Sequence, residues 1–271
     1  MKFAVTISEY VKPMMPFVLC GDIYKQLEYA HSINYDAAEI HVCRPANVDV
    51  DMLISKCEKN KMQITSFGTG FSYTLIGLTL THPDHELRMS AINRIKEYID
   101  LAYHFNSVVI IGLTKGNVGI LGEDVYFRTF SESIYECLTY AEKKGVNIAI
   151  EAINRYESNV LNNIESIFQF IKPFNSDNIK IHIDSFHMNI EESDFCSEIF
   201  KYGSYIGHVH FADNNRLYPG QGHINFREIL DALIKVDYKG NIGLECLPLP
   251  TGEECAVKGR DYVLSLMNSL N

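Results

Sequence analysis

Four ionisable residues in the second half of the sequence each stand at the end of a short, mostly apolar run: Glu151, Asp184, His210 and Glu245. They are 33, 26 and 35 residues apart, which leaves room for about one helix in each interval. Three carboxylates buried together repel one another and lose their hydration, so such a group is stable only around a cation. Three carboxylate ligands and one imidazole suit Mn²⁺, Mg²⁺ or Co²⁺. The spacing therefore predicts one divalent metal site.

Three further polar residues follow the same runs. Glu157, His187 and Arg216 each come within six residues after one of the predicted metal ligands. Taken singly, each is more often a surface residue, but their shared placement favours a common role. A carboxylate, an imidazole and a guanidinium beside a metal form a polar surface suited to a polyol. We therefore predict that these three residues contact the hydroxyl groups of a substrate.

Short β-branched runs, which are typical of strands, alternate along the chain with longer segments of helical periodicity. Eight strands are predicted, at Phe3–Ile7, Ala38–Val42, Gln63–Phe67, Val108–Gly112, Asn147–Ala152, Ile179–Asp184, Ile206–Phe211 and Ile242–Cys246. Helices are predicted within residues 22–34, 85–105, 125–145, 162–174, 197–203, 226–240 and 262–270. This count and alternation are typical of an α/β fold in which eight strands close into a (β/α)₈ TIM barrel.

The strands are apolar on both faces, as in residues 107–112, which favours a parallel sheet covered by helices. An open doubly wound sheet is the alternative. The most glycine-rich stretch, residues 67–71, lacks the third glycine and the immediate helix start of its phosphate-binding turn. We therefore predict a single TIM-barrel domain over residues 1–271. Its metal site would lie at the C-terminal ends of strands five to eight, where barrel enzymes build their active sites.

Two more histidines, His182 and His208, lie two residues before Asp184 and His210. Strand alternation places them on the same face as those two residues. We expect them to be hydrogen-bonded residues lower in the barrel rather than metal ligands.

The composition excludes several classes of protein. A formal net charge of −10 without a clustered basic face argues against a nucleic-acid partner. The apolar runs are too short for a membrane span, and the N-terminal residues are typical of a strand rather than of a secretory signal. Seven scattered cysteines without a CxxC pair are expected to be free thiols. These features predict a cytoplasmic protein that does not bind membranes.

The second half of the chain resembles the D-tagatose/D-psicose (allulose) 3-epimerase family, within the xylose-isomerase-like TIM barrels. The resemblance rests on four segments that span most of residues 146–246: IEAINRYESN, IHIDSFHMNIEE, GHVHFADNNRLYPGQGHINFREIL and YKGNIGLEC. The first half matches mainly in its alternation of strands and helices, with weaker matches at residues 82–92 and 107–112. The family usually lines the far end of its pocket with aromatic residues that include tryptophan, and this chain has no tryptophan.

The resemblance implies that Glu151, Asp184, His210 and Glu245 bind the metal, and that Glu151 and Glu245 are also the acid/base pair. It implies sugar contacts for the three loop residues described above. Mn²⁺ is the expected ion, with Co²⁺ or Mg²⁺ as alternatives, and a ketose is the expected substrate. A homodimer or homotetramer is also implied by the family alone.

These expectations describe an isomerase, a metal-dependent ketose 3-epimerase that works through an enediolate formed by removal of the C3 proton. Two alternatives use the same residues: an aldose–ketose or inosose-type isomerase, and a metal-dependent dehydratase. A phosphodiesterase of the endonuclease IV type would need more metal ligands and a basic face. A non-catalytic sugar-binding barrel also remains open at this stage.

Overall fold

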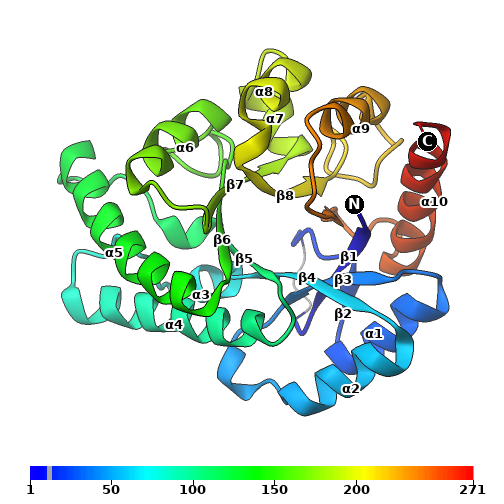
Figure 1. Cartoon of the computed structure of the whole chain (residues 1–271), viewed down its shortest axis with the longest axis horizontal. Coiled ribbons are helices and arrows are strands. Elements are labelled where there is room, and N and C mark those ends of the chain that lie inside the picture. The colour runs from blue at the N-terminus through cyan, green and yellow to red at the C-terminus, as the bar shows by residue number, and fades with distance from the viewer. Residues whose placement is uncertain (11–13, 271) are drawn as a thin grey trace.

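All eight predicted strands are present and form one closed parallel sheet in the computed structural model, which describes residues 1–10 and 14–270 (Figure 1). The strands are β1 (Phe3–Ser8), β3 (Ala37–His41), β4 (Gln63–Gly68), β5 (Val108–Ile111), β6 (Asn147–Glu151), β7 (Ile179–Asp184), β8 (Ile206–Phe211) and β9 (Ile242–Leu244). Each strand pairs with the next in this order, and pairing of β1 with β9 closes the barrel. The prediction of a TIM barrel is confirmed. A ninth, two-residue strand that was not predicted, β2 (Leu19–Cys20), pairs with the end of β1.

Helices surround this barrel on its outer side (Figure 1). The helices that were predicted are α1 (Ile23–Ser32), α4 (His85–Tyr103), α5 (Glu123–Lys144), α6 (Ile164–Ile171), α8 (Phe195–Tyr202), α9 (Phe226–Lys235) and α10 (Gly252–Leu270). Three helices were not specified from the sequence: α2 (Val50–Asn60), α3 (Gly70–Thr74) and α7 (Ser185–Glu191). Helix α10 begins ten residues before the predicted segment. Within residues 1–10 and 14–270, no helix has the length and apolar character that a membrane span requires.

The helix ends follow local sequence signals. Asp22, Asp49 and Asp84 precede α1, α2 and α4, and each side chain accepts one or two hydrogen bonds from the first free backbone N–H groups of its helix. Helix α5 ends at Gly145, whose left-handed backbone, with a φ of 66°, suits a residue without a Cβ atom. The three aspartates thus mark where their helices begin, and Gly145 marks where α5 ends.

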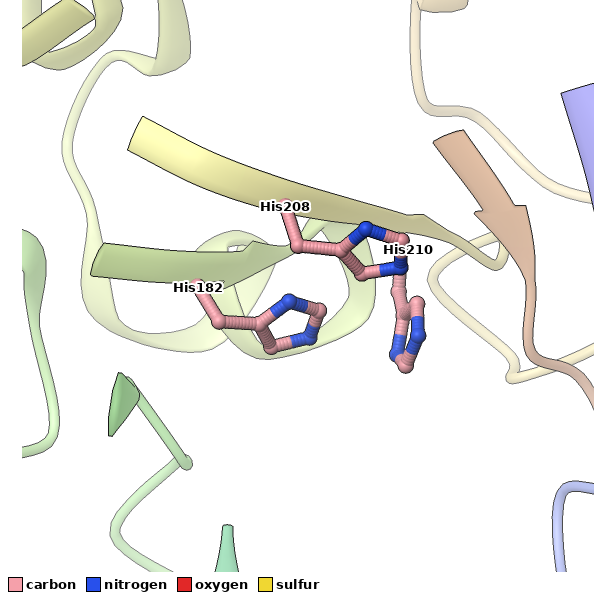
Figure 2. Close-up of side chains that lie close together, drawn as sticks. All are labelled: His182, His208 and His210. Atoms are coloured by element: carbon pink, nitrogen blue, oxygen red, sulfur yellow. The ribbon is translucent and has the colours of Figure 1, made fainter. Parts of the chain in front are cut away.

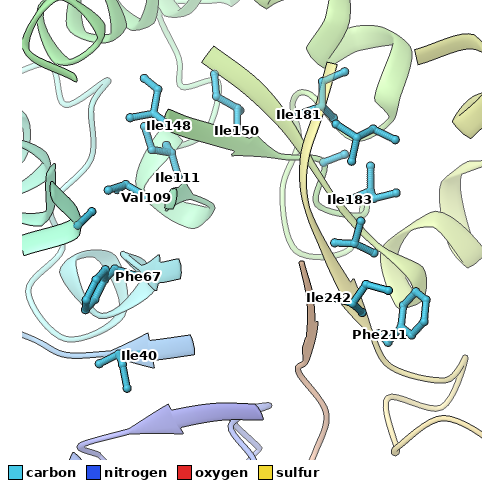
Figure 3. Close-up of a cluster of buried hydrophobic side chains, with 14 of the residues drawn as sticks. Ile40, Phe67, Val109, Ile111, Ile148, Ile150, Ile181, Ile183, Phe211 and Ile242 are labelled. Carbon is cyan, nitrogen blue, oxygen red and sulfur yellow. The ribbon is translucent and has the colours of Figure 1, made fainter. Parts of the chain in front are cut away.

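The apolar core lies between the sheet and the helices. Figure 3 shows part of it, with Ile148 and Ile150 from β6 beside Ile181 and Ile183 from β7. These four side chains are at most 1% exposed. Because side chains alternate across a strand, the residues between them point into the barrel, so outward packing of the isoleucines directs their neighbours inwards.

The interior of the barrel carries polar side chains from β3, β4 and β8. Glu39 of β3 hydrogen-bonds with Ser66 of β4 and lies 2.8 Å from Nε2 of His208 of β8. Strands β3 and β8 are not neighbours in the sheet, so this contact must cross the barrel interior. All three side chains are at most 1% exposed. The interior therefore carries a buried polar network that reaches from one wall to the other.

Candidate active site

The structure brings the four predicted ligands together. Glu151 and Asp184 are the last residues of β6 and β7, His210 is near the end of β8, and Glu245 directly follows β9. Each of the four offers one ligand atom, and these atoms all lie within 4.8 Å of one another. All four residues are buried. This group is called the four-residue cluster below. It forms because parallel strands end at the same rim of the barrel.

The electrostatics of the four-residue cluster are unfavourable without a cation. Burial, followed by repulsion from Glu245, raises the pKa of Glu151 from its ordinary value to about 8. Burial also raises the pKa of Asp184 to about 6, although Arg216 acts in the opposite direction. Carboxyl groups crowded in a dry site hold their protons because a second negative charge there is costly. A divalent cation would relieve that repulsion.

Within the cluster, Oδ2 of Asp184 is buried without a hydrogen-bond partner, and Nδ1 of His210 has only a long contact of 3.5 Å to Oε2 of Glu245. The other oxygen of Asp184 accepts the backbone N–H of Phe186 at 2.7 Å. The other nitrogen of His210 lies 2.9 and 3.0 Å from the two oxygens of Glu39. An imidazole that binds a metal through one nitrogen commonly has a carboxylate at the other. The residues present therefore fit a divalent ion.

A group of three histidines, His182, His208 and His210, also places ligand atoms within 4.8 Å of one another (Figure 2). The rings of His182 and His208 are stacked, with centroids 5.2 Å apart and planes inclined by 20°. Ring lone pairs lie in the ring plane, so nearly parallel stacked rings cannot both point at one ion between them. His208 also lies within hydrogen-bonding distance of Glu39 and Ser66. This group is therefore a poorer metal site than the four-residue cluster.

The two lower histidines differ from each other. The expectation of hydrogen bonds is met for His208, but it is wrong for His182, whose two ring nitrogens are both buried without a partner. Nε2 of His182 is 3.7 Å from Oε1 of Glu151, which is beyond hydrogen-bonding distance. Burial and the neighbouring histidines hold the pKa of His182 well below its ordinary value, so the ring is neutral.

A third possible group consists of Glu39, His41 and Glu245. Glu39, however, is already engaged, because the rings of His41, His208 and His210 and the hydroxyl of Ser66 all lie within hydrogen-bonding distance of its oxygens. Burial favours the neutral form of Glu39, but these neighbours, with His210 the strongest, hold its pKa well below the ordinary value. Glu39 therefore orients the histidines around it.

A cavity of about 230 Å³ opens beside the four-residue cluster. Glu151, His210 and Glu245 line it, and so do all three residues predicted to contact a substrate, Glu157, His187 and Arg216. Its remaining lining is mostly apolar and includes Met14, Met15, Phe17, Leu113 and Ile153. A larger open hollow of about 830 Å³ is lined by residues of α5, α6 and the loops beside them, and it contains none of the residues predicted from the sequence. The chemistry therefore belongs to the smaller cavity.

The three predicted substrate contacts are held by one another and by the cluster. Arg216 places its two terminal nitrogens 3.3 Å from Glu245 and 3.5 Å from Glu157. Its guanidinium also lies over the ring of Phe186, 4.5 Å from the centroid. His187 lies on α7 rather than on a loop, with Nε2 3.7 Å from Glu151. The structure therefore brings together all seven residues singled out from the sequence.

Two buried charged residues beside the site were not predicted, Glu39 and Lys115. Glu39 left a signal in the sequence, because a glutamate stands between the apolar residues Ala38 and Ile40 in the middle of β3. Lys115 left none, since it follows β5 in an ordinary polar turn. Only the tertiary contacts reveal that both side chains are completely buried.

Comparison with known proteins gives the family. The family model described as xylose isomerase-like TIM barrel matches residues 27–263. The D-psicose 3-epimerase of Ruminiclostridium cellulolyticum is 39% identical over 201 residues, which cover 70% of this chain and 69% of that protein. The L-ribulose 3-epimerase of Mesorhizobium japonicum is 28% identical over 233 residues, which cover 83% of this chain and 75% of that protein.

The fold agrees with these relatives. A crystal structure of D-psicose 3-epimerase with D-tagatose, from Clostridium cellulolyticum, superposes with a TM-score of 0.82 at 21% sequence identity. The match covers 98% of this chain and 99% of that one. The chain belongs to the xylose isomerase-like TIM barrel family and, within it, to the group of sugar epimerases that includes the D-psicose and L-ribulose 3-epimerases.

Proposed function

We propose that this protein is a metal-dependent ketose 3-epimerase that inverts the configuration at C3 of a free ketose. The observation that carries the proposal is the placement of two carboxylates, Glu151 and Glu245, on one cavity. Glu151 comes from β6, and Glu245 follows β9, with two strands between them in the barrel. Two acid/base groups that approach a substrate from separate parts of the wall are what inversion requires.

The four-residue cluster would hold the ion, for which we propose Mn²⁺. Oδ2 of Asp184, which has no hydrogen-bond partner, and Nδ1 of His210, which lies 3.5 Å from Glu245, support this assignment. Bound there, a divalent ion would polarise the C2 carbonyl of a ketose and so make the C3 proton more acidic.

Glu151 and Glu245 are the proposed proton-transfer groups. One carboxylate removes the C3 proton, and the other returns a proton to the opposite face of the near-planar enediolate. A single base would return the proton to the face it came from and would leave the configuration unchanged. Positioned acid/base groups typically contribute about 10² to 10⁴-fold each.

Arg216, His187 and Glu157 are the proposed sugar-binding residues. Arg216 is anchored between two carboxylates and over an aromatic ring, so its remaining N–H groups have a defined direction. Nδ1 of His187 lies 2.7 Å from the side-chain nitrogen of Asn154, which leaves Nε2 on the side of Glu151. Glu157 is 42% exposed and can accept a hydrogen bond from a hydroxyl group of an entering sugar.

The test is conversion of D-psicose and L-ribulose, the sugars in the names of the relatives, in deuterated water with Mn²⁺. We expect each active ketose to be converted to its C3 epimer, with deuterium at C3 of the product. NMR spectroscopy of the purified product shows both the configuration and the labelled carbon. Removal of the metal with EDTA should abolish conversion, and Mn²⁺ should restore it.

Two results would contradict the proposal. Epimerisation without deuterium at C3 would exclude proton transfer by carboxyl groups that exchange their protons with the solvent. Formation of an aldose, with the label at C1 or C2, would instead identify an aldose–ketose isomerase on the same barrel.

A further inference from the structure

His41 is a buried histidine at the end of β3 that no part of the proposed chemistry uses. Its side chain is only 5% exposed, yet it is among the residues that line the cavity of about 230 Å³. One of its ring nitrogens, one oxygen of Glu39 and one oxygen of Glu245 all lie within 4.8 Å of one another. His41 therefore borders the cavity beside Glu245, one of the two proposed proton-transfer groups.

The ring of His41 is held by one of its two nitrogens. Nε2 lies 2.6 Å from Oε1 of Glu39. An ionised carboxylate can only accept hydrogen bonds, so Nε2 is the donor of this pair. Nδ1 is buried and has no hydrogen-bond partner among the residues that the structure describes. In the neutral ring, this second nitrogen is an acceptor that still lacks a donor.

Two neighbours hold the ring in its orientation. The ring of Phe17 packs against it, with centroids 4.3 Å apart and planes inclined by 44°. Gly68 of β4 pairs with His41 in the sheet, and a Cβ atom at Gly68 would come within 2.3 Å of Nδ1. Phe17 and Gly68 line the cavity as His41 does. Because Gly68 has no side chain, the edge of the ring that carries Nδ1 can lie at the wall of the cavity.

His41 and His187 lie on opposite walls of this cavity. Strands β3 and β7 are separated by three strands in both directions around the closed barrel, so they stand across from each other. His187 lies on α7, which directly follows β7, and both histidines line the cavity. A sugar that occupies the cavity is therefore enclosed between His41 and His187.

We infer that His41 is a further sugar-binding residue, whose Nδ1 accepts a hydrogen bond from a hydroxyl group of the ketose beside Glu245 while Glu39 holds Nε2. This inference rests on the proposed function, which supplies the ketose. A hydroxyl group of the sugar is the donor that Nδ1 lacks in the protein. Glu39 also lies 2.9 Å from Nε2 of His210, so one buried carboxylate positions both a sugar contact and a proposed metal ligand.

The substitutions His41→Gln and His41→Asn separate the roles of the two nitrogens. The longer amide of glutamine can replace Nε2 as the donor to Glu39, but it leaves no acceptor at the place of Nδ1. This variant should keep the melting temperature and the Mn²⁺ affinity of the parent protein. Its Kd for D-psicose, measured by calorimetry, and its KM for an epimerised ketose should rise on the order of tenfold, with a smaller change in kcat, because one hydrogen bond to the sugar is lost.

His41→Asn should give the opposite pattern. The shorter amide can place its oxygen near the position of Nδ1, but it no longer reaches Glu39. The melting temperature should therefore fall, while the Kd for D-psicose should stay closer to that of the parent protein than the Kd of the Gln variant does. The matched control is His104→Gln, the same chemical change at an exposed position after α4, which should alter none of these quantities.

A histidine that serves only to hold Glu39 would reverse this order. The Gln variant would then bind the sugar as the parent protein does, and the Asn variant would bind it more weakly. That result would overturn the inference, and so would the absence of any ketose binding by the parent protein. If the parent protein binds D-psicose but epimerises no ketose, the proposed function fails, while the two Kd values still test the contact with His41.

NMR spectroscopy of the Mg²⁺-loaded parent protein with ¹⁵N-labelled histidine tests the same contact without any substitution. The signal of Nδ1 of His41 should shift when D-psicose is added, because an acceptor nitrogen gains a hydrogen bond. A signal that stays in place at saturating sugar would contradict the inference. This measurement also decides the question if either substitution of His41 prevents folding.

Discussion

At the scale of single residues, Glu151 and Glu245 occupy different electrostatic environments within the same cluster. Burial and Glu245 raise the pKa of Glu151 to about 8. Burial acts on Glu245 in the same direction, but His210 and Arg216 outweigh it and lower its pKa. Two carboxyl groups whose proton affinities are pushed apart in this way are typical of an acid/base pair.

The pair can be tested with Glu151→Gln and Glu245→Gln. At saturating Mn²⁺, each substitution should lower kcat for epimerisation by about 10² to 10⁴-fold, because one of the two proton-transfer groups is lost. The remaining carboxylate can still remove and return a proton on its own face. Each variant should therefore exchange deuterium into only one of the two epimers, as measured by NMR spectroscopy.

The control is Glu165→Gln, which removes an exposed carboxylate on α6 and should leave kcat unchanged. If either active-site variant exchanged deuterium into both epimers, Glu151 and Glu245 would not each transfer protons on one face of the enediolate.

At the scale of secondary-structure elements, the end of β5 determines how closely Glu151 can approach its neighbours. Gly112 directly follows β5, and a Cβ atom there would collide with Oε2 of Glu151. Substitution Gly112→Ala should therefore displace the Glu151 carboxylate and weaken Mn²⁺ binding by at least tenfold, while the far-UV circular dichroism stays unchanged.

Gly119 offers a matched control in the loop that follows. A Cβ atom at Gly119 meets no atom within 4 Å, so Gly119→Ala should bind Mn²⁺ as the parent protein does. If calorimetry gave equal Mn²⁺ affinities for the two alanine variants, the space beside Glu151 would not affect metal binding.

At the scale of the whole molecule, the crowded carboxylates make the stability of the metal-free protein depend on pH. The pKa of Glu151 is about 8 in the folded chain against an ordinary value of 4.5, so the folded state binds more protons than the unfolded state between these values. Stability then falls as the pH rises towards 8. Asp184 and His210, whose pKa values are also raised, act in the same direction.

Groups with lowered pKa values act in the opposite direction, but mostly outside the range from pH 6.5 to 8. The gain in stability with rising pH that comes from His182 is complete above about pH 6.5. The corresponding gain from Lys115 begins only near pH 8. We therefore expect the melting temperature of EDTA-treated protein to fall between pH 6.5 and 8. The Mn²⁺-loaded protein should show no such fall, because the ion replaces the bound proton. In a metal-free Glu151→Gln variant, the melting temperature should fall less over this pH range. An equal fall would show that Glu151 is not its cause.

The local sequence determined the barrel and the place of its predicted site. Strand and helix periodicity are local properties, and they were enough to predict eight strands, whose observed ends lie within two residues of the predicted ones. Parallel strands end at one rim, so the spacing of Glu151, Asp184, His210 and Glu245 already implied that they meet. The sequence periodicity did not show that residues 185–191 form a helix, because that helix has only seven residues, about two turns, and is too short for a clear repeat.

Only the tertiary structure decided which polar groups lie behind that site. Glu39 meets His208, which is 169 residues away in the chain, because β3 and β8, which are separated in the barrel by β1 and β9, both direct a side chain into its interior. The backbone carbonyl of the fully buried Lys115 accepts hydrogen bonds from Thr81 and Tyr126, and nothing in its own turn marks it as special. Residue type and spacing record which face of a strand a side chain occupies, whereas the partners it meets across a closed barrel depend on how all eight strands are arranged around it.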